Sequence, residues 1–238
     1  MNIALIFAGG TGQRMNSRAK PKQFLELHGK PVILYTLDHF EAHADIDAIA
    51  VVCLKSWIEE LQQQLHRYDF KKVVRVVPGG PTGHESIYNG LAALQSVCAP
   101  DDIVLIHDGV RPLITQELIS KNIASVEAHG TAITVEAATE SVVASRDGSK
   151  IDAVPPRGHM HVAKAPQSFR YGMIWALYQK AQADGIFSID SAHLLSLYDA
   201  EMHMVHGPRN NLKITAPADY YIFRALYEAI ENQQIMGI

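Results

Sequence analysis

Residues 5–24 read LIFAGGTGQRMNSRAKPKQF, an apolar run that turns abruptly into glycines and cations. Residues 3–7 have the length and the unbroken apolar character of a buried strand. Gly9, Gly10 and Gly12 follow this strand directly, and because glycine has no Cβ, backbone N–H groups there can approach a phosphate closely. The stretch therefore predicts an α/β protein whose first strand ends in an anion-binding loop.

Apolar runs of strand length recur along the chain with helical patterns between them. Such alternation is typical of parallel strands joined by crossover helices. We therefore expect one domain over residues 1–238, a three-layer α/β/α sandwich around a Rossmann-like, mostly parallel sheet. The expected strands are residues 3–7, 49–54, 73–77, 103–107, 132–135 and 202–206, and the expected helices are residues 31–43, 56–68, 84–97, 115–129, 171–182, 188–197 and 217–231.

The composition is that of a globular chain with no general affinity for polyanions. A formal charge of −4, from 21 Lys and Arg against 25 Asp and Glu, predicts neither a nucleic-acid partner nor an acidic membrane surface. The apolar runs are strand-sized, so no membrane segment is expected. The only cysteines are Cys53 and Cys98, and no signal-like stretch precedes the domain, which favours the reducing cytoplasm.

Residues 139–160 break the alternation of strands and helices. They read TESVVASRDGSKIDAVPPRGHM, in which an Asp-Gly turn signal lies between two short β-prone stretches and Pro-Pro follows. This pattern predicts a projecting β-hairpin arm, with a surface loop as the alternative. Because a lone two-stranded ribbon is only marginally stable, we expect the arm to pack on a partner subunit or on its own core.

Cations follow the glycine loop closely. Arg14 and Lys22, with Arg18 and Lys20 between them, are suited to clamp a triphosphate, because arginine recognises planar phosphate faces and lysine supplies a compact charge. The loop is not a Walker A sequence, since no Gly-Lys-Ser/Thr closes it. A tight turn without a ligand and a solvated basic run are the alternatives.

Asp108 lies in the stretch LIHDGVRPLI, at the carboxyl end of a predicted buried strand, where open α/β sheets bind their ligands. A single carboxylate that faces a triphosphate is sufficient for Mg²⁺, which binds one or two protein carboxylates together with phosphate oxygens. A helix cap or a turn before Gly109 is the alternative for Asp108. Arg111 is a candidate either for a local salt bridge or for the phosphate of a second substrate.

Five blocks in the same order carry a resemblance to a known family: AGGTGQRM with KPKQFLELHGKPV, then VVPGG at 76–80, HDGVRP at 107–112, APQSF at 165–169 and NLKIT at 211–215. Over the whole chain, the sequence resembles the sugar- and polyol-phosphate nucleotidylyltransferases. Within them it is similar to the cytidylyltransferases that act on 2-C-methyl-D-erythritol 4-phosphate or ribitol 5-phosphate. The resemblance implies a sheet of the nucleotidyltransferase type and a homodimer in which the arm crosses to the neighbouring subunit.

The resemblance also implies roles for particular residues. Arg14, Lys22 and Lys213 would neutralise the phosphates during catalysis, Asp108 would hold Mg²⁺, and Asp108, Arg111 and Lys213 would bind the polyol phosphate. CTP would lie against a set of small residues: Ala8, Gly9, Gly10, Thr11, Gly12, Gly79, Gly80 and Ser86. The expected products are a CDP-polyol and pyrophosphate, for a cell-surface polymer such as teichoic acid or capsule, or for isoprenoid synthesis.

Departures from the methylerythritol pattern favour the ribitol branch. The first loop reads Ala8-Gly9-Gly10 where those enzymes usually have Ala-Ala-Gly, and HDGVRP replaces His-Asp-Ala-Ala-Arg-Pro. Ile189 stands where they usually have threonine, and the arm carries Glu140-Ser141 in place of Asp-Thr. The preferred acceptor is therefore D-ribitol 5-phosphate, with 2-C-methyl-D-erythritol 4-phosphate as the alternative.

Two other functions are compatible with parts of the sequence. A non-catalytic nucleotide-binding protein would share the fold, but the joint presence of Arg14, Lys22, Asp108 and Lys213 speaks against it. A nicotinamide-dependent reductase would carry an acidic residue after the second strand, where this chain has Lys55. Twelve histidines invite a metal centre, but no Cys or carboxylate cluster accompanies them in the sequence.

Overall fold

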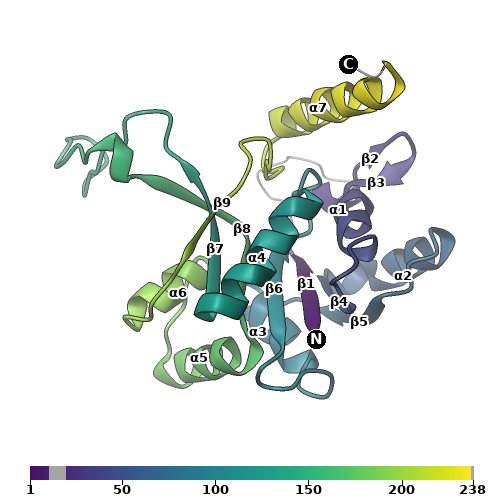
Figure 1. Ribbon diagram of the computed structural model, residues 1–238, viewed down its shortest axis with the longest axis horizontal. Helices are drawn as coiled ribbons and strands as arrows, with labels where there is room; N and C mark the ends of the chain where they lie inside the picture. The colour runs from purple at the N-terminus through teal and green to yellow at the C-terminus, as the bar shows by residue number, and fades with distance from the viewer. Residues whose placement is uncertain (11–19, 237–238) are drawn as a thin grey trace.

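The structure is a computed structural model that describes residues 1–10 and 20–236 (Figure 1). Within these residues the chain forms a seven-stranded sheet in the order β5-β4-β1-β6-β8-β7-β9, in which every neighbouring pair is parallel except the two that β8 makes. The expected mostly parallel α/β fold is confirmed. The strands of the sheet are β1 (Asn2–Ala8), β4 (Ala48–Cys53), β5 (Val73–Pro78), β6 (Ile103–Asp108), β7 (Thr131–Ala137), β8 (His161–Arg170) and β9 (Met204–His206).

Helices cover both faces of the sheet, which makes the three predicted layers. One apolar core lies between the sheet and helices α1, α2 and α4, and a second lies between the sheet and helices α3, α5 and α6. Each expected helix is present within a few residues of its expected bounds. The helices are α1 (Val32–Glu41), α2 (Ile58–Arg67), α3 (Gly83–Ala93), α4 (Gln116–His129), α5 (Tyr171–Asp184), α6 (Ser191–Leu197) and α7 (Pro217–Met236).

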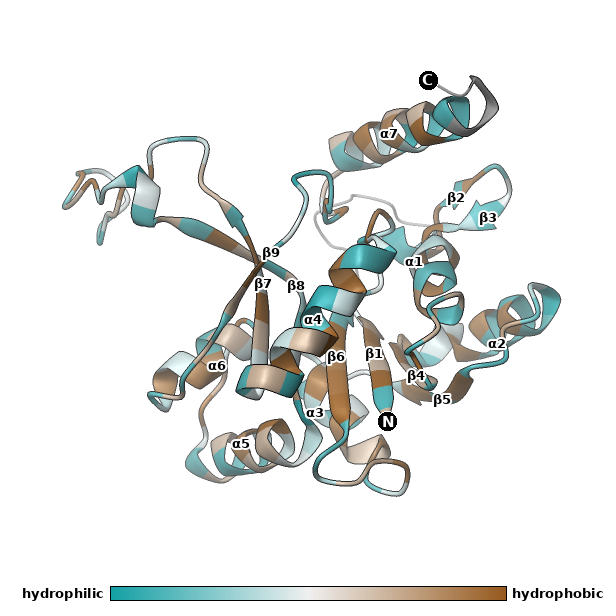
Figure 2. Ribbon diagram, viewed as in Figure 1, coloured by the Kyte–Doolittle hydropathy of each residue, from teal (hydrophilic) through white to brown (hydrophobic). Residues whose placement is uncertain are grey.

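Strand β1 shows why an unbroken apolar run is needed at the centre of the sheet. Ile3 and Leu5 face the core of α3 and α5, while Ala4 and Ile6 face the core of α1 and α4. All four side chains are fully buried, because successive side chains of a strand point to opposite faces and both faces are covered. Figure 2 shows the same feature as the brown, hydrophobic strands at the centre of the molecule.

Helix α7 packs outside the three layers, on a third and smaller core. Its Phe223 is fully buried against Tyr35 of α1, with ring centroids 5.6 Å apart, and Ile214 belongs to the same cluster. The short hairpin of β2 (Glu26–Leu27) and β3 (Lys30–Pro31) adds Leu27 to this core. Across residues 1–10 and 20–236, none of the helices, α7 included, is both long and apolar enough to cross a membrane.

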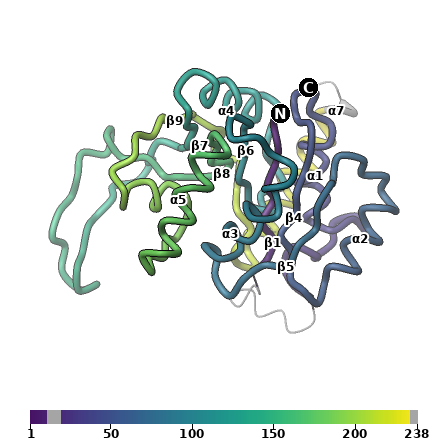
Figure 3. The backbone as a smooth tube through the Cα atoms, turned by 90° about the horizontal axis from the view of Figure 1, so that it is seen from below, coloured from purple at the N-terminus to yellow at the C-terminus, as the bar shows by residue number. Residues whose placement is uncertain are grey.

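The segment between β7 and β8 leaves the body of the molecule, as Figures 1 and 3 both show. The predicted turn is present, with Gly148 at a φ of 74°, but the pairing that we expected over residues 139–160 is reduced to a single bridge between Ala144 and Ala153. Most side chains of the arm are exposed. A longer ribbon does not form because neither face of the arm has a core to pack on within this chain.

Strand β8 was not predicted from the sequence. Its residues 165–169 are buried between β6 and β7, and Pro166 lies inside them, although proline removes a donor from a sheet. The register between β7 and β8 shifts between Ile133 and Val135, which accommodates the proline as a local irregularity. The strand extends the sheet beyond β6 and aims the arm away from the body.

Candidate active site

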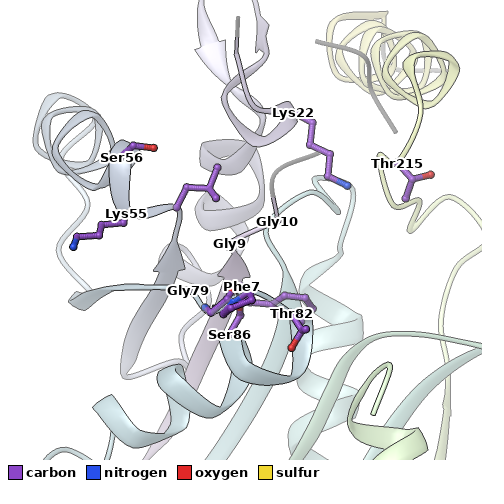
Figure 4. A pocket seen from close by; sticks show the side chains of 14 residues that line it. Phe7, Gly9, Gly10, Lys22, Lys55, Ser56, Gly79, Thr82, Ser86 and Thr215 are labelled. Atoms are coloured by element: carbon purple, nitrogen blue, oxygen red, sulfur yellow. Dashed lines mark hydrogen bonds between the residues drawn. The ribbon is translucent and has the colours of Figure 1, made fainter. Parts of the chain in front are cut away.

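A large cavity opens where the parallel strands β1, β4 and β5 end, as expected for ligand sites in open α/β sheets. It has a volume of about 1010 Å³, the upper limit of ordinary small-molecule pockets. Figure 4 shows Lys22 and Thr215 on one side of it and Lys55 and Ser56 on the other. The lining residues are Phe7, Gly9, Gly10, Lys22, Leu54, Lys55, Ser56, Gly79, Gly80, Pro81, Thr82, Gly83, Ser86 and Thr215.

The floor of the pocket is formed by two glycines from different loops. A Cβ placed on Gly79 would lie 3.1 Å from the Cα of Gly9 and 2.9 Å from the Oγ of Ser86. A side chain at Gly79 would therefore force Ser86 or the backbone of Gly9 to move, and glycine lets the loop after β1 and the loop after β5 meet without such a shift. The two glycine motifs of the sequence therefore make one surface.

Ser86 and a capping box hold the second glycine loop. The Ser86 hydroxyl accepts a hydrogen bond from the Gly80 N–H at 3.1 Å and also contacts the Gly80 carbonyl oxygen at 3.3 Å. Thr82 Oγ1 accepts from the backbone N–H of Glu85 at 3.1 Å, and Glu85 Oε2 accepts from the Thr82 N–H at 3.0 Å. This reciprocal pair starts helix α3 at a defined residue and fixes the turn that precedes it.

Lys22 connects the first loop to the segment before α7. Its Nζ donates a hydrogen bond to the carbonyl oxygen of Ile214 at 2.9 Å, and its side chain reaches into the pocket. Ile214 is in turn held by its backbone N–H, which donates to the carbonyl of Val110 at 2.9 Å. Three segments that are far apart in the sequence therefore meet at one edge of the pocket.

Asp108, Arg111 and Lys213 form a compact ionic cluster beside the pocket. Arg111 Nε lies 2.7 Å from Oδ2 of Asp108, and Lys213 Nζ lies 2.5 Å from Oδ1. Burial by itself would raise the pKa of Asp108, but Lys213 and then Arg111 outweigh it and hold this pKa well below its usual range. The carboxylate is therefore ionised, and both of its oxygens face a cation.

The cluster borders the pocket through Phe7. Lys213 Nζ lies 5.8 Å from the centre of the Phe7 ring, and Phe7 lines the cavity and pairs with Asp108 in the register of β1 and β6. Asp108 and Arg111 are themselves only 4% and 8% exposed and do not line the cavity. Lys213 is about one-third exposed, so it is the member of the cluster that can turn towards a ligand.

His107 supports Arg111 and does not contact Asp108 through a hydrogen bond. The side chain is fully buried, and this burial lowers its pKa to about 3, so the imidazole is neutral. Its Nε2 lies 3.4 Å from the carbonyl oxygen of Arg111, and a neutral ring donates there. The hydrogen bond of His107 therefore goes to the backbone of Arg111 and not to the carboxylate of Asp108.

The structure brings together most of the residues expected at the site. Gly9, Gly10, Lys22, Gly79, Gly80 and Ser86 line the pocket, Ala8 is buried directly before Gly9, and Asp108, Arg111 and Lys213 lie beside it. Thr11, Gly12 and Arg14 fall outside the described residues. Sequence reasoning missed Ser56, Thr82 and Thr215 and gave Lys55 no role here. Lys55 and Ser56 directly follow a predicted strand, so the rule that placed Asp108 could have found them.

Few of the described side chains near the pocket are suited to bind a metal ion. No group of three His, Cys, Asp or Glu side chains within residues 1–10 and 20–236 is placed to hold one. Asp108 is the carboxylate of the ionic cluster beside the pocket, and each of its oxygens is already paired with a cation. The described part of the chain therefore holds no such group of ligands, and an ion beside Asp108 would need oxygens that a ligand supplies.

A mostly parallel sheet whose carboxyl edge carries a glycine-floored pocket with lysines at its rim is typical of a nucleotide-binding α/β protein. Comparison with known proteins gives the family. The sequence model described as "IspD: 2-C-methyl-D-erythritol 4-phosphate cytidylyltransferase" matches residues 2–229. The chain belongs to this cytidylyltransferase family.

Relatives cover the full length of the chain. A ribitol-5-phosphate cytidylyltransferase of Streptococcus agalactiae is 48% identical, and one of Vibrio parahaemolyticus is 46% identical, with 100% of each chain covered in both cases. Among solved structures, the 4-diphosphocytidyl-2C-methyl-D-erythritol synthase of Anaerococcus prevotii is 30% identical, with a TM-score of 0.82 over 95% of this chain and 96% of that one. The relatives therefore carry two different names, ribitol-5-phosphate cytidylyltransferase and 4-diphosphocytidyl-2C-methyl-D-erythritol synthase.

Proposed function

We propose that this protein is a ribitol-5-phosphate cytidylyltransferase, which joins CTP and D-ribitol 5-phosphate to give CDP-ribitol and pyrophosphate. The observation that carries the proposal is the 46–48% identity over the whole chain to relatives of that name, against 30% to the methylerythritol synthase structure. We propose that the CDP-ribitol serves a cell-surface polymer such as teichoic acid or capsule.

The pocket offers a place for each part of CTP. We assign the cytosine and ribose to the floor formed by Gly9, Gly79 and Gly80, where backbone groups are accessible because no side chains cover them. The triphosphate then extends towards Lys22 on the rim of the pocket. In this placement the size of the floor between the two glycine loops selects a pyrimidine over a purine.

The chemistry needs positioned charge and no covalent intermediate. A phosphate oxygen of ribitol 5-phosphate attacks the α-phosphorus of CTP, a new P–O bond forms, and the bond from the α-phosphorus to the bridging oxygen breaks as pyrophosphate leaves. Negative charge builds up on the non-bridging oxygens and on the departing pyrophosphate. We assign the neutralisation of that charge to Lys22, which lines the pocket, and to Lys213, which lies next to Phe7 at its edge, because fixed cations supply much of the rate enhancement in phosphoryl transfer.

Lys213 has two possible partners in this scheme. In the structure its ammonium group pairs with Asp108, and a substrate phosphate offers a competing anion next to it. When Lys213 turns to the phosphate, Asp108 keeps Arg111 as its partner. Asp108 therefore pairs with Lys213 when no substrate is bound. It also keeps Arg111 in position beside the acceptor.

Magnesium is proposed as the cofactor, and Asp108 as its protein ligand. The ionised carboxylate is chemically suited to Mg²⁺, but the metal can take Oδ1 only after Lys213 leaves it, so the triphosphate oxygens must carry most of the coordination. Bound magnesium would add positive charge against the phosphates. Removal of divalent ions with EDTA is expected to abolish turnover, and added Mg²⁺ to restore it; turnover that persists in EDTA would exclude a metal.

We also propose that the enzyme is a cytoplasmic homodimer. The arm exposes apolar side chains that a partner would cover, since Val143 is 50%, Ile151 64% and Val154 60% exposed. Both cysteines are free thiols, as expected in a reducing compartment. Sedimentation of the protein and of a variant with Ile151→Asp and Val154→Asp tests the interface: the variant is expected to sediment as a monomer, and an unchanged species would place the interface elsewhere.

The experiment that tests the proposed function is pyrophosphate release with a panel of acceptors. We expect turnover with Mg²⁺, CTP and D-ribitol 5-phosphate, and kcat/KM at least tenfold lower with other four- and five-carbon polyol phosphates. Lys22→Ala is expected to lose activity while it keeps its unfolding temperature, and Lys121→Ala, a surface lysine paired with Glu117, serves as the matched control. Turnover with another nucleoside triphosphate but not with CTP would contradict the base assignment.

A second candidate has support from the family description and from the Anaerococcus prevotii structure. In that case 2-C-methyl-D-erythritol 4-phosphate is the acceptor, and the product would serve isoprenoid synthesis. The same panel decides between the two, because the preferred acceptor is the one with the higher kcat/KM.

A further inference from the structure

Gln23 is a buried polar residue next to the pocket that the proposed chemistry does not use. Its side chain is 1% exposed, and it does not line the cavity. A buried amide group is expected to have a specific structural partner, because leaving its donors unpaired costs about 1–3 kcal/mol. The partners of Gln23 lie at the end of β1 and in the glycine loop that follows it.

The side-chain amide of Gln23 binds two carbonyl groups, one at the end of β1 and one in the glycine loop. Nε2 donates a hydrogen bond to the carbonyl oxygen of Ala8 at 2.7 Å and a longer one to the carbonyl oxygen of Gly10 at 3.3 Å. Gly9 and Gly10 line the pocket and Gln23 does not, so the two hydrogen bonds hold the backbone of the pocket wall from the side that faces away from the cavity.

These bonds determine which way the backbone of the loop faces. In a trans peptide unit the C=O and the following N–H point in opposite directions. The bond from Gln23 holds the Ala8 carbonyl towards Gln23, so the N–H of Gly9 faces away from Gln23. Glycine restricts rotation of the backbone less than any other residue does. Hydrogen bonds from Gln23 are therefore needed to fix the peptide orientation at Gly9 and Gly10.

The residues on either side of Gln23 fix the position of its backbone. Gln23 is the middle residue of a 3-10 turn, Lys22–Phe24. Phe24 is buried in the core and stacks on Trp57 with ring centroids 4.6 Å apart, while Lys22 reaches into the pocket and donates to Ile214. Three consecutive side chains therefore bind the core, the glycine loop and the segment before α7.

We propose that Gln23 is a positioning residue that sets the affinity of the glycine loop for the nucleotide. This inference rests on the proposed function, because it assumes that the loop binds CTP. Gln23 acts through the backbone of Gly9 and Gly10 and does not touch the nucleotide. An amide is required, since a carboxylate cannot donate and an apolar side chain of the same length leaves two carbonyls without this partner.

Equilibrium binding of CTP, measured by calorimetry without acceptor, tests the proposal. Gln23→Met keeps the length of the side chain and removes both hydrogen bonds, and we expect its Kd for CTP to rise about tenfold. Gln23→Asn keeps the amide on a shorter side chain, and a smaller rise is expected. In turnover assays the KM for CTP should rise in both variants while the KM for the acceptor stays within twofold.

Asn122 of α4 provides the matched control, because it is a fully buried amide that does not line the pocket and donates to the Leu118 carbonyl and to Thr134 of β7. Asn122→Leu is expected to lose stability and to bind CTP as the parent protein does. If both Gln23 variants bind CTP within twofold of the parent, or if neither folds, Gln23 is a core residue and the proposal is overturned. Failure of the parent protein to bind CTP would instead overturn the proposed function.

Discussion

Lys213 Nζ lies 2.5 Å from Oδ1 of Asp108, so a lysine that precedes the last helix and a carboxylate at the end of a central strand form one ion pair. Arg111 binds the other oxygen of the same carboxylate. The pair is largely buried on the Asp108 side and about one-third exposed on the Lys213 side. It therefore couples the interior of the sheet to the rim of the pocket.

Removal of the Asp108 charge should destabilise the protein. In Asp108→Asn, Arg111 stays buried without its ionised partner, and breaking a buried pair in this way costs about 3–5 kcal/mol. We expect a loss of about 3 kcal/mol in the free energy of unfolding in urea. Glu117→Gln, which breaks an exposed pair with Lys121, is the control and should change it by less than about 1 kcal/mol.

The contribution of Asp108 to stability should depend on pH with a defined sign. The pKa of Asp108 is lowered in the folded protein, so its contribution is present in full above the unfolded value, about 3.9, and is lost as the pH falls towards the folded value. The difference in unfolding free energy between the parent and Asp108→Asn should therefore be constant above pH ~5 and shrink below pH ~4. A difference that grows as the pH falls would show that the carboxyl group is protonated in the folded state.

Gly79→Ala should damage the pocket floor. The added Cβ meets Ser86 Oγ and the Cα of Gly9, so the two glycine loops must separate. We expect the KM for CTP to rise about tenfold, equivalent to about 1.4 kcal/mol of binding energy. Gly158→Ala in the arm, where a Cβ meets nothing within 4 Å, should keep the parent KM for CTP. Equal effects of the two substitutions would contradict the assignment of Gly79 to the nucleotide pocket.

The capping threonines of α3 and α4 allow stability and binding to be separated. Thr82 caps α3 at the pocket, and Thr115 caps α4 away from it through a hydrogen bond from the Leu118 N–H at 3.2 Å. Alanine at either position should cost about 1 kcal/mol in unfolding free energy. Only Thr82→Ala should also weaken CTP binding, because it loosens the turn that holds Gly80. A rise in the Kd for CTP in Thr115→Ala would show that the effect is a general loss of stability.

The sequence was sufficient for the parts of the fold that depend on local pattern. Strand β1 and its glycine loop were predictable because a buried parallel strand must be apolar on both faces and because glycines mark the turn that follows it. Strand β8 was not, since Pro166 argues against a strand and the burial of its residues is a tertiary effect. The arm was predicted as a ribbon because a turn signal does not show whether the flanking residues have a surface to pack on.

The site was predictable in its residue types and only partly in its geometry. Asp108 and Lys22 could be placed near the carboxyl edge of the sheet from their positions after strands. That Lys213 pairs with Asp108, and that Gln23 holds the carbonyls of Ala8 and Gly10, depends on contacts between distant segments. Composition and spacing along the chain do not specify such contacts.

The central claim is that the glycine-floored pocket transfers CMP from CTP to D-ribitol 5-phosphate, and phosphorus NMR of one reaction mixture tests it most directly. CTP, D-ribitol 5-phosphate, Mg²⁺ and the enzyme should yield the two coupled signals of a diphosphate diester, together with an equal amount of pyrophosphate. Consumption of CTP to CMP and pyrophosphate without a diester, or no reaction with ribitol 5-phosphate while 2-C-methyl-D-erythritol 4-phosphate is converted, would contradict the account.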